Sequence, residues 1–225
     1  MAGRREDGEP LKLREKAYDA FKQRLLSREI LPGQFVSQRE LVEVTGLTLG
    51  AIRELVPRLE AEGLIRTVPQ RGMQVAHIDL PLIRDAFQFR MVIEKEAMAL
   101  FVARASDAEM ARIEAAHLSI VERSRSGITP ALLAEAQAVD WGLHDTIVDA
   151  MGNEIISKAY RVNAIKIRLI RQQDIRIHDS IMDGVMEEHL RIVRAMVARD
   201  AKEAVAALEG HINHAWARAM GLEER

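Results

Sequence analysis

The chain has 225 residues, of which 48% are hydrophobic, so it can bury one large core or two modest ones. Only 4% of the residues are aromatic, and Ala, Leu, Ile, Arg and Glu are abundant, which favours a mainly helical protein over a β-sandwich or barrel. The absence of cysteine excludes disulfides, thiolate nucleophiles and cysteine-based zinc sites.

The formal net charge is −2, and positions 1–76 carry 13 basic against 11 acidic residues. Charge alone therefore does not predict a nucleic-acid-binding protein. The start, MAGRREDGEP, lacks the apolar core of a signal peptide, and no apolar run approaches the roughly 20 residues of a membrane span. We expect a soluble, cytoplasmic protein with no membrane partner.

The first folded unit is predicted over residues 11–76, after a flexible tail at 1–10. Ala17, Phe21 and Leu25 are spaced four apart, which predicts an amphipathic helix that ends near Ile30. The sequence LPG directly after Ile30 is typical of a chain reversal.

Two further helices are predicted with a tight turn between them. Ser37 precedes Glu40 by three positions, the spacing of a capping box at the start of a helix. Gly46 ends this helix and Thr48 caps the next, which runs to Gly63, so the pair forms a helix-turn-helix. The stretches LIRTV and MQVA, joined by PQRG, then predict a two-stranded wing.

This order of elements resembles the N-terminal domain of GntR-family bacterial transcription regulators. The residues that carry the resemblance are Val36–Ser37, Arg39–Glu40–Leu41, Gly46–Leu47–Thr48, Ile52–Arg53–Glu54, Leu59–Glu60, Glu62–Gly63–Leu64 and Arg71–Gly72. The resemblance implies a winged helix-turn-helix that binds double-stranded operator DNA, with contacts from Arg39, Thr48, Gly50, Arg53, Arg71 and Gly72. Arginine suits such contacts because its guanidinium group pairs with phosphate or guanine.

Three residues depart from the family pattern. Leu49 stands where the family usually has an arginine that touches DNA, and Ala51 stands where proline is common. Pro57 falls in the second half of the recognition helix, where it removes a backbone hydrogen bond. We therefore expect a kinked or shortened recognition helix, and the operator sequence of relatives cannot be transferred.

After a linker at 77–80, residues 81–225 are predicted to form an all-helical bundle of about six helices. Helix starts are indicated by Asp79–Leu80–Pro81, Ser106 with Glu109, Thr129–Pro130, Gly152–Asn153 and Asp200 with Glu203. The fold class is thus mainly α: a winged helix-turn-helix of three helices and a two-stranded wing, followed by a helical bundle.

Four side chains in the bundle are candidate metal ligands: Asp140, His144, His189 and His211. Asp140 and His144 lie four apart, which places them on one face of a helix, and the other two come from separate helices. Imidazole with one carboxylate suits a divalent first-row metal ion, and four ligands can close a tetrahedral zinc site. For any one histidine, the alternative is a hydrogen-bonded core or surface residue.

The bundle resembles the FCD ligand-sensing domain of the FadR subfamily. The matching residues are Arg90, Glu94, Asp140, His144, Gly152–Asn153, Glu188–His189, Asp200 and His211. The resemblance implies that the four candidates bind a divalent metal, with zinc first and nickel or manganese as alternatives. It also implies a small organic or sugar acid as effector, for which we select Arg90, Arg161, Asn163, Arg168 and His214. His77, His117 and His178 are expected to be surface or linker residues.

The leading hypothesis is a homodimeric repressor that binds a pseudo-palindromic operator and responds to a small carboxylate bound near the metal. The alternative from another class is a metal-dependent hydrolase or decarboxylase that uses the same Asp/His site to activate water. A third possibility is a metal that only stabilises the fold.

Overall fold

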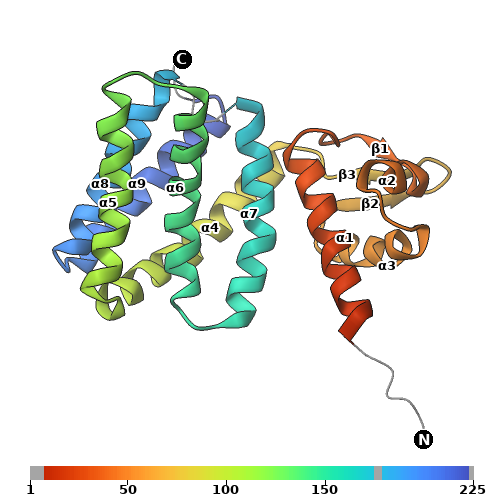
Figure 1. Cartoon of the computed structure of the whole chain (residues 1–225), viewed down its shortest axis with the longest axis horizontal. Helices are drawn as coiled ribbons and strands as arrows, with labels where there is room; N and C mark the ends of the chain where they lie inside the picture. The colour runs from red at the N-terminus through yellow and green to blue at the C-terminus, as the bar shows by residue number, and fades with distance from the viewer. Residues whose placement is uncertain (1–7, 175–178, 223–225) are drawn as a thin grey trace, which may run out of the picture. The chain divides into compact units, whose positions relative to one another are not determined.

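The computed structural model describes residues 8–174 and 179–222. The chain divides into two compact units, Met1–Leu82 and Ile83–Arg225. The first combines helices with a small sheet and the second is helical, as Figure 1 shows for each unit. The mainly helical fold predicted from composition and periodicity is confirmed.

Among its described residues, the first unit contains three helices and three short strands. Its elements are α1 (Gly8–Leu26), β1 (Phe35–Val36), α2 (Gln38–Thr45), α3 (Leu49–Ala61), β2 (Ile65–Val68) and β3 (Gly72–Val75). Ser37 and Glu40 form the predicted capping box at the start of α2, and the Thr48 hydroxyl caps α3 by accepting from Ala51 N. Helices α2 and α3 are the predicted helix-turn-helix, with Gly46 left-handed at the turn (φ 70°).

The sheet has three strands rather than the two predicted. β3 lies between β2 and β1, and both pairings are antiparallel. β1 pairs only Phe35 with Gln74 and Val36 with Met73. A strand of two residues has no periodicity to detect, so the sequence predicted only the two wing strands.

Two helix ends also differ from the prediction. α1 ends at Leu26 instead of near Ile30, because Arg28 is left-handed (φ 65°) and the Ile30 N–H donates to Arg24 O across the turn. Helix α3 was predicted to be kinked or shortened at Pro57, and it is not shortened but continues to Ala61. Pro57 is exposed while Leu59 is buried, so packing of the opposite side holds the second half of α3 in place.

The second unit is a bundle of helices. Its described elements are α4 (Leu80–Arg104), α5 (Asp107–Ser124), α6 (Pro130–Asp149), α7 (Glu154–Asp174), α8 (Asp179–Val197) and α9 (Ala201–Ala219). α8 packs against α5 and α9, and α5 packs against α6. α4 runs obliquely behind α6 and α7 in Figure 1. Ser106, Thr129 and Asp200 cap the helices that they were predicted to start.

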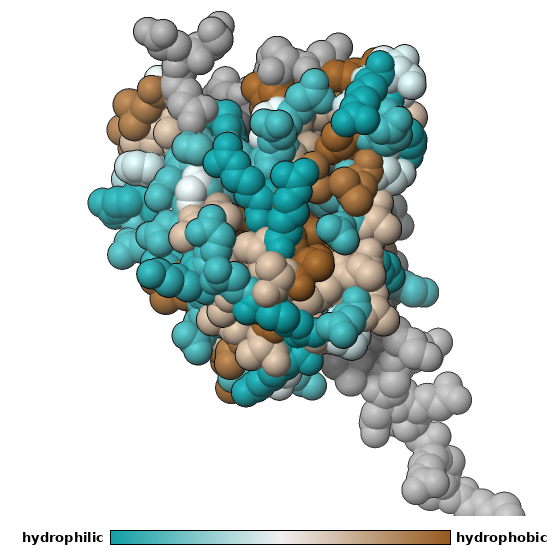
Figure 2. Space-filling view, turned by 90° about the vertical axis from the view of Figure 1, so that its left-hand side faces the viewer, coloured by the Kyte–Doolittle hydropathy of each residue, from teal (hydrophilic) through white to brown (hydrophobic). Residues whose placement is uncertain are grey.

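The core between α5, α6 and α8 is apolar. It contains the buried residues Ile120, Leu132, Ala136, Met182, Val185 and Met186. On the face shown in Figure 2, hydrophilic side chains cover much of the surface, with apolar ones scattered between them. Among the described residues, no helix combines the length and apolar character needed to cross a membrane.

Gly72 should be the glycine of the wing that least tolerates a side chain. Its φ is +89°, and a Cβ there would lie 3.0 Å from the carbonyl oxygen of Val36 in β1. We expect Gly72→Ala to lower the free energy of unfolding of the first unit by about 1–3 kcal/mol, because a left-handed backbone strains an L side chain. Urea denaturation followed by circular dichroism measures this change.

Gly46→Ala is the matched control for Gly72→Ala. Gly46 is also left-handed (φ +70°), but a Cβ there would have nothing within 4 Å. Gly46→Ala should lower the free energy of unfolding by about 1–2 kcal/mol, through backbone strain alone. Equal losses in the two variants would show that the contact between Gly72 and β1 is without consequence.

Candidate metal centre and adjoining pocket

The four predicted metal ligands converge in the interior of the bundle. Helix α6 supplies Asp140 and His144 from one face, α8 supplies His189, and α9 supplies His211. Each side chain is at most 3% exposed, and one ligand atom from each lies within 4.8 Å of all the others. The four side chains selected from the sequence and from the family resemblance therefore meet in space.

The distances between these atoms match a small coordination shell. Asp140 Oδ1 lies 2.9 Å from His189 Nε2, 3.9 Å from His144 Nε2 and 3.8 Å from His211 Nε2. Tetrahedral zinc with bonds of about 2.0–2.1 Å separates its ligand atoms by about 3.3–3.4 Å. Among the described residues, the buried His144 Nε2 has no hydrogen-bond partner. The donor set and its geometry fit a divalent metal ion.

Each histidine of the centre is oriented through its other ring nitrogen. His144 Nδ1 lies 2.7 Å from Glu94 Oε2, and His211 Nδ1 lies 2.8 Å from Glu188 Oε2. A carboxylate accepts the Nδ1–H proton, which leaves the lone pair of Nε2 directed at the centre. Asp140 is also held, because its Oδ2 accepts a hydrogen bond of 2.8 Å from Gln137.

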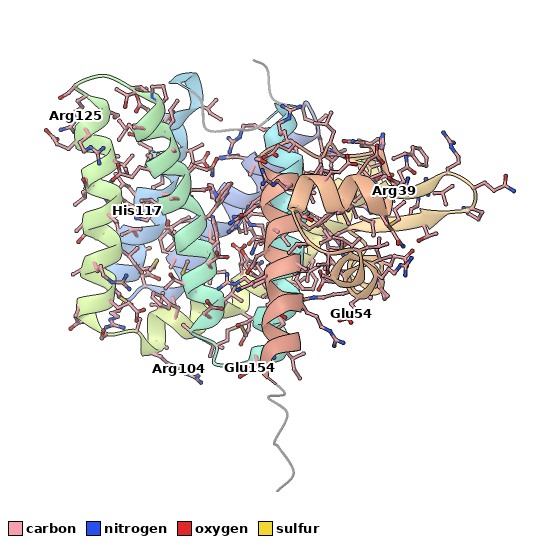
Figure 3. The ribbon with its side chains drawn as sticks, turned by 45° about the vertical axis from the view of Figure 1, so that its right-hand side comes forward. Arg39, Glu54, Arg104, His117, Arg125 and Glu154 are labelled. Atoms are coloured by element: carbon pink, nitrogen blue, oxygen red, sulfur yellow. The ribbon has the colours of Figure 1, made fainter. Side chains whose placement is uncertain are left out.

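His189 has a different partner, a fourth buried histidine. Its Nδ1 lies 3.1 Å from His117 Nε2, and His117 Nδ1 lies 2.7 Å from the carbonyl oxygen of Ile113. His117 is 1% exposed, so its predicted place on the surface is wrong. In Figure 3 it lies on the side of α5 that faces α6 and α8.

Burial favours the neutral form of two histidines of the centre, His144 and His211. Burial lowers the pKa of His144 and His211 below the ordinary value of 6.5, and neighbouring cationic groups add to the effect. Burial likewise lowers the pKa of His117 to about 4. Neutral imidazole is the form that binds a metal, so burial keeps the ligands ready at physiological pH.

Glu94 connects the centre to α4 and α7. Besides His144, it accepts hydrogen bonds at Oε1 from Arg90 Nε (2.7 Å) and from the Tyr160 hydroxyl (2.5 Å). Burial opposes ionisation of this carboxyl, but Arg90, His144 and Tyr160 outweigh burial and lower the pKa of Glu94 to about 2. Glu94 is therefore a carboxylate at any pH at which the protein is expected to work.

A pocket adjoins the centre on the side of His144. Its cavity volume is about 20 Å³, which is room for about one water molecule. Its lining consists of Arg90, Trp141, His144, Asp145, Tyr160, Asn163, Ala164, Ile167 and Arg168. His144 thus belongs to both the pocket and the metal centre, and α4, α6 and α7 build the pocket wall.

Of the five residues selected for effector binding, three line this pocket and two lie outside its lining. Arg90, Asn163 and Arg168 line the pocket, with Arg168 4.4 Å above the Trp141 ring. Arg161 is partly exposed and pairs with Asp145 and Asp149. His214 is largely exposed, lies outside the lining of this pocket and is held by Glu188 at 2.7 Å.

The six residues selected for DNA contacts are all exposed in the first unit. Arg39 is on α2, Thr48 caps α3, and Gly50 and Arg53 follow on its first turns. Arg71 precedes the wing strand β3, and its guanidinium group lies 4.2 Å above the ring of Phe35. Gly72 begins β3.

Two family models match the chain over almost all of this architecture. The model of bacterial regulatory proteins of the gntR family matches residues 13–75, and the FCD domain model matches residues 85–214. The chain belongs to the GntR family and carries an FCD domain.

Named relatives and solved structures agree with this membership. The GntR-family chain is 26% identical to the Nta operon transcriptional regulator of Aminobacter aminovorans, over 83% of its own length and 85% of the relative's. It is 25% identical to the HTH-type transcriptional repressor GlaR of Escherichia coli, over 84% of its own length and 90% of the relative's. Its fold is similar to that of E. coli McbR/YncC, with a TM-score of 0.74 at 15% identity. This match covers 93% of the present chain and 97% of the E. coli chain.

The GntR-family chain is thus a DNA-binding transcriptional regulator, and its relatives are regulators rather than enzymes. The hydrolase or decarboxylase alternative is not retained. The four ligands form a possible metal site inside its FCD domain. The isolated FCD domain of TM0439, solved metal-free, has the same fold, with a TM-score of 0.53 at 19% identity over 65% of this chain and 97% of that one.

Sequence reasoning missed His117, although a signal for it existed. Met110, Ile113, His117 and Ile120 are spaced three or four apart and form the buried side of α5. A histidine within such a stripe lies in the core. His178, expected to be a surface or linker residue, lies outside the described residues, and His77 is exposed as predicted.

The metal-free protein should lose stability as the pH falls from about 6.5 towards 4. The folded-state pKa of His117 is about 4, below the unfolded value of 6.5, so the unfolded chain binds more protons in this interval. Each such histidine should lower the free energy of unfolding by about 1.4 kcal/mol per pH unit. His144 and His211 act in the same direction. Urea denaturation of chelator-treated protein at pH 7.5, 6 and 5 measures the slope.

His77→Gln is the control for this pH dependence, because the His77 side chain is exposed. The variant should keep the slope of the wild type. A free energy of unfolding that stays constant between pH 7 and pH 5 would contradict the neutral, buried state of the cluster.

Proposed function

We propose that this regulator is a homodimeric repressor that acts in the cytoplasm and binds a pseudo-palindromic operator through two winged helices. A helix-turn-helix places the first residues of its second helix in the major groove, so two copies read two half-sites. In this proposal, Arg39, Thr48, Gly50 and Arg53 contact the DNA from α2 and α3, and Arg71 and Gly72 contact it from the wing. The E. coli relative named a transcriptional repressor supports the choice of repression.

We further propose that Asp140, His144, His189 and His211 hold a divalent ion, with zinc as the first choice and nickel or manganese as alternatives. The observation that carries this proposal is the convergence of four buried donor atoms whose histidines are oriented by Glu94, Glu188 and His117. Zinc accepts such a set of nitrogen and oxygen ligands without strain in four-fold coordination. The bound ion would act as a Lewis acid toward an oxygen atom of the effector.

The effector in this proposal is a small organic or sugar acid that enters the pocket beside His144. Among the described residues, two buried donors of the pocket wall, Arg90 Nη1 and Trp141 Nε1, have no hydrogen-bond partner. A carboxylate would satisfy such donors, and a guanidinium group binds it with both charge and geometry. Asn163 and Arg168 line the same pocket and are the next candidates for contacts.

Arg161 and His214 are kept in the proposal as residues that support the site from outside. Arg161 pairs with Asp145, which also accepts a hydrogen bond of 3.1 Å from Arg168. His214 shares Glu188 with His211. Both residues would thus influence the effector or the metal through a neighbour.

Repression should depend on Arg53 and be sensitive to salt. We expect Arg53→Ala to weaken binding to the DNA upstream of the protein's own coding region by about 1–3 kcal/mol, because the exposed arginine of α3 is lost from the interface. Affinity of the wild type should fall as salt rises, since phosphate contacts release counterions. Fluorescence anisotropy at several salt concentrations measures both effects, and sedimentation gives the oligomeric state.

Arg125→Ala is the matched control for Arg53→Ala. It removes the same charge from the C-cap of α5 in the FCD domain, where Arg125 pairs with Glu122 on the surface. Its DNA affinity should equal that of the wild type. Equal losses of DNA affinity in both variants would show that Arg53 acts only through its contribution to the net charge. A monomer that binds DNA as tightly as expected of the dimer would refute the arrangement with two half-sites.

A metal-dependent effector should stabilise only the metal-loaded protein with an intact pocket. We expect an organic or sugar acid at 100 times its Kd to add about 2.7 kcal/mol of stability to the wild type. Chelation, Asp140→Asn and Arg168→Ala should each reduce this gain. Thermal-shift screening of such acids, with and without chelator, measures it.

Arg168→Ala is a better probe than Arg90→Ala, because Arg90 also holds the buried Glu94 that orients His144. Arg104→Ala, at the C-terminal end of α4, serves as the control for removal of a positive charge. A ligand whose stabilisation is unchanged by chelation would place the metal in a purely structural role.

A further inference from the structure

We propose that His117 is a positioning residue of the metal centre, which fixes the tautomer and orientation of His189 by accepting a hydrogen bond from its Nδ1–H. This inference rests on the proposed metal binding by Asp140, His144, His189 and His211. Helix α5 carries His117 and none of these four ligands. The inference thus adds a further helix of the bundle to the centre.

The direction of the hydrogen bonds follows from a backbone carbonyl. The Ile113 oxygen can only accept, so His117 Nδ1, 2.7 Å away, must carry its proton. A neutral imidazole then has its lone pair on Nε2, and this atom lies 3.1 Å from His189 Nδ1. His189 must therefore donate from Nδ1, which leaves the lone pair of its Nε2 directed at the other ligands.

His189 needs this constraint more than its neighbours do. Its Nε2 lies 2.9 Å from Asp140 Oδ1 and 3.3 Å from His211 Nε2. With a proton on Nε2, His189 would donate a charge-assisted hydrogen bond to Asp140 and would be unable to bind a metal. The acceptor on His117 favours the opposite tautomer, in which Nε2 is free of a proton.

The chemistry of the partner also distinguishes His189. His144 and His211 donate to the carboxylates of Glu94 and Glu188, whereas His189 donates to a neutral ring. The rings of His117 and His189 are stacked, with centroids 5.3 Å apart and planes inclined by 29°. His117 therefore orients His189 without adding a negative charge to the buried centre.

The test compares variants that remove or retain the acceptor at position 117 in the full-length protein. His117→Leu fills similar space without an acceptor, and His117→Gln offers an amide oxygen. We expect His117→Leu to weaken Zn²⁺ binding by about 10–100-fold, the usual effect of losing a partner of a metal-bound histidine. His117→Gln should recover much of the loss. Competition with a chromogenic chelator measures the affinity.

Ile120→Ala is the control for packing, because Ile120 is buried one turn further along α5 in the core with α8. It should lower the unfolding temperature of the metal-free protein but leave Zn²⁺ affinity close to that of the wild type. Equal losses of affinity in Ile120→Ala and His117→Leu would overturn the proposal, because the effect would then be one of packing alone.

The tautomer of His189 gives a readout that packing does not supply. Long-range ¹H–¹⁵N NMR of the metal-free wild type should show His189 protonated at Nδ1, and the Nε2–H form should appear in His117→Leu. His189 protonated at Nε2 in the wild type would overturn the inference even where a variant fails to fold. If Asp140→Ala also leaves Zn²⁺ binding intact, the metal site itself is wrong, and this result is distinct from a failure that concerns His117 alone.

Discussion

The organisation of the FCD domain depends on the burial of four polar side chains at one point. Asp140, His144, His189 and His211 are each at most 3% exposed, and a buried polar group without a partner is costly. The structure meets this constraint on the outer side of each group, with Glu94, Glu188, His117 and Gln137. The inner atoms are then free to face one another, which is the arrangement that a cation requires.

Satisfying these groups recruits helices far apart in the sequence. Glu94 comes from α4 and binds His144 of α6, Arg90 of its own helix and Tyr160 of α7. Such a network in a low-dielectric interior contributes more to stability than the sum of its separate hydrogen bonds, because each hydrogen bond polarises the next. A change at the pocket wall, where Arg90 and Tyr160 lie, is therefore connected to His144 of the candidate metal site through one carboxylate.

Local signals in the sequence predicted what local physics determines. Capping residues such as Ser37 and Thr129 start the predicted helices because the hydroxyl of each accepts a hydrogen bond from the backbone N–H three residues on. The four-residue interval between Asp140 and His144 predicted a shared helix face, because residues four apart lie about one turn from each other on an α-helix. The convergence of three helices on one site followed from the family resemblance rather than from these local rules.

What the sequence did not predict depends on contacts between distant segments. β1 forms because Phe35 and Val36 pair with β3. Pro57 does not end α3, because the opposite side of that helix is packed. The prediction of a surface position for His117 is wrong, because its spacing from Ile113 and Ile120 is that of the buried stripe of α5. Arg161 and Arg168 lie about two turns apart on α7, on the same side of the helix. Only the lining of the pocket, which includes Arg168 and not Arg161, distinguishes them.

The size of the pocket constrains how an effector would be sensed. The centre of a water molecule has only about 20 Å³ available, which is room for about one water and not for an organic acid. Arg168 pairs with Asp145 and stacks on Trp141, and the two charged side chains of this pair are partly exposed, so they have room to move. A ligand that enters must therefore bind a more open arrangement than this one. That difference in affinity between two arrangements is the thermodynamic requirement for a ligand to change the state of the protein.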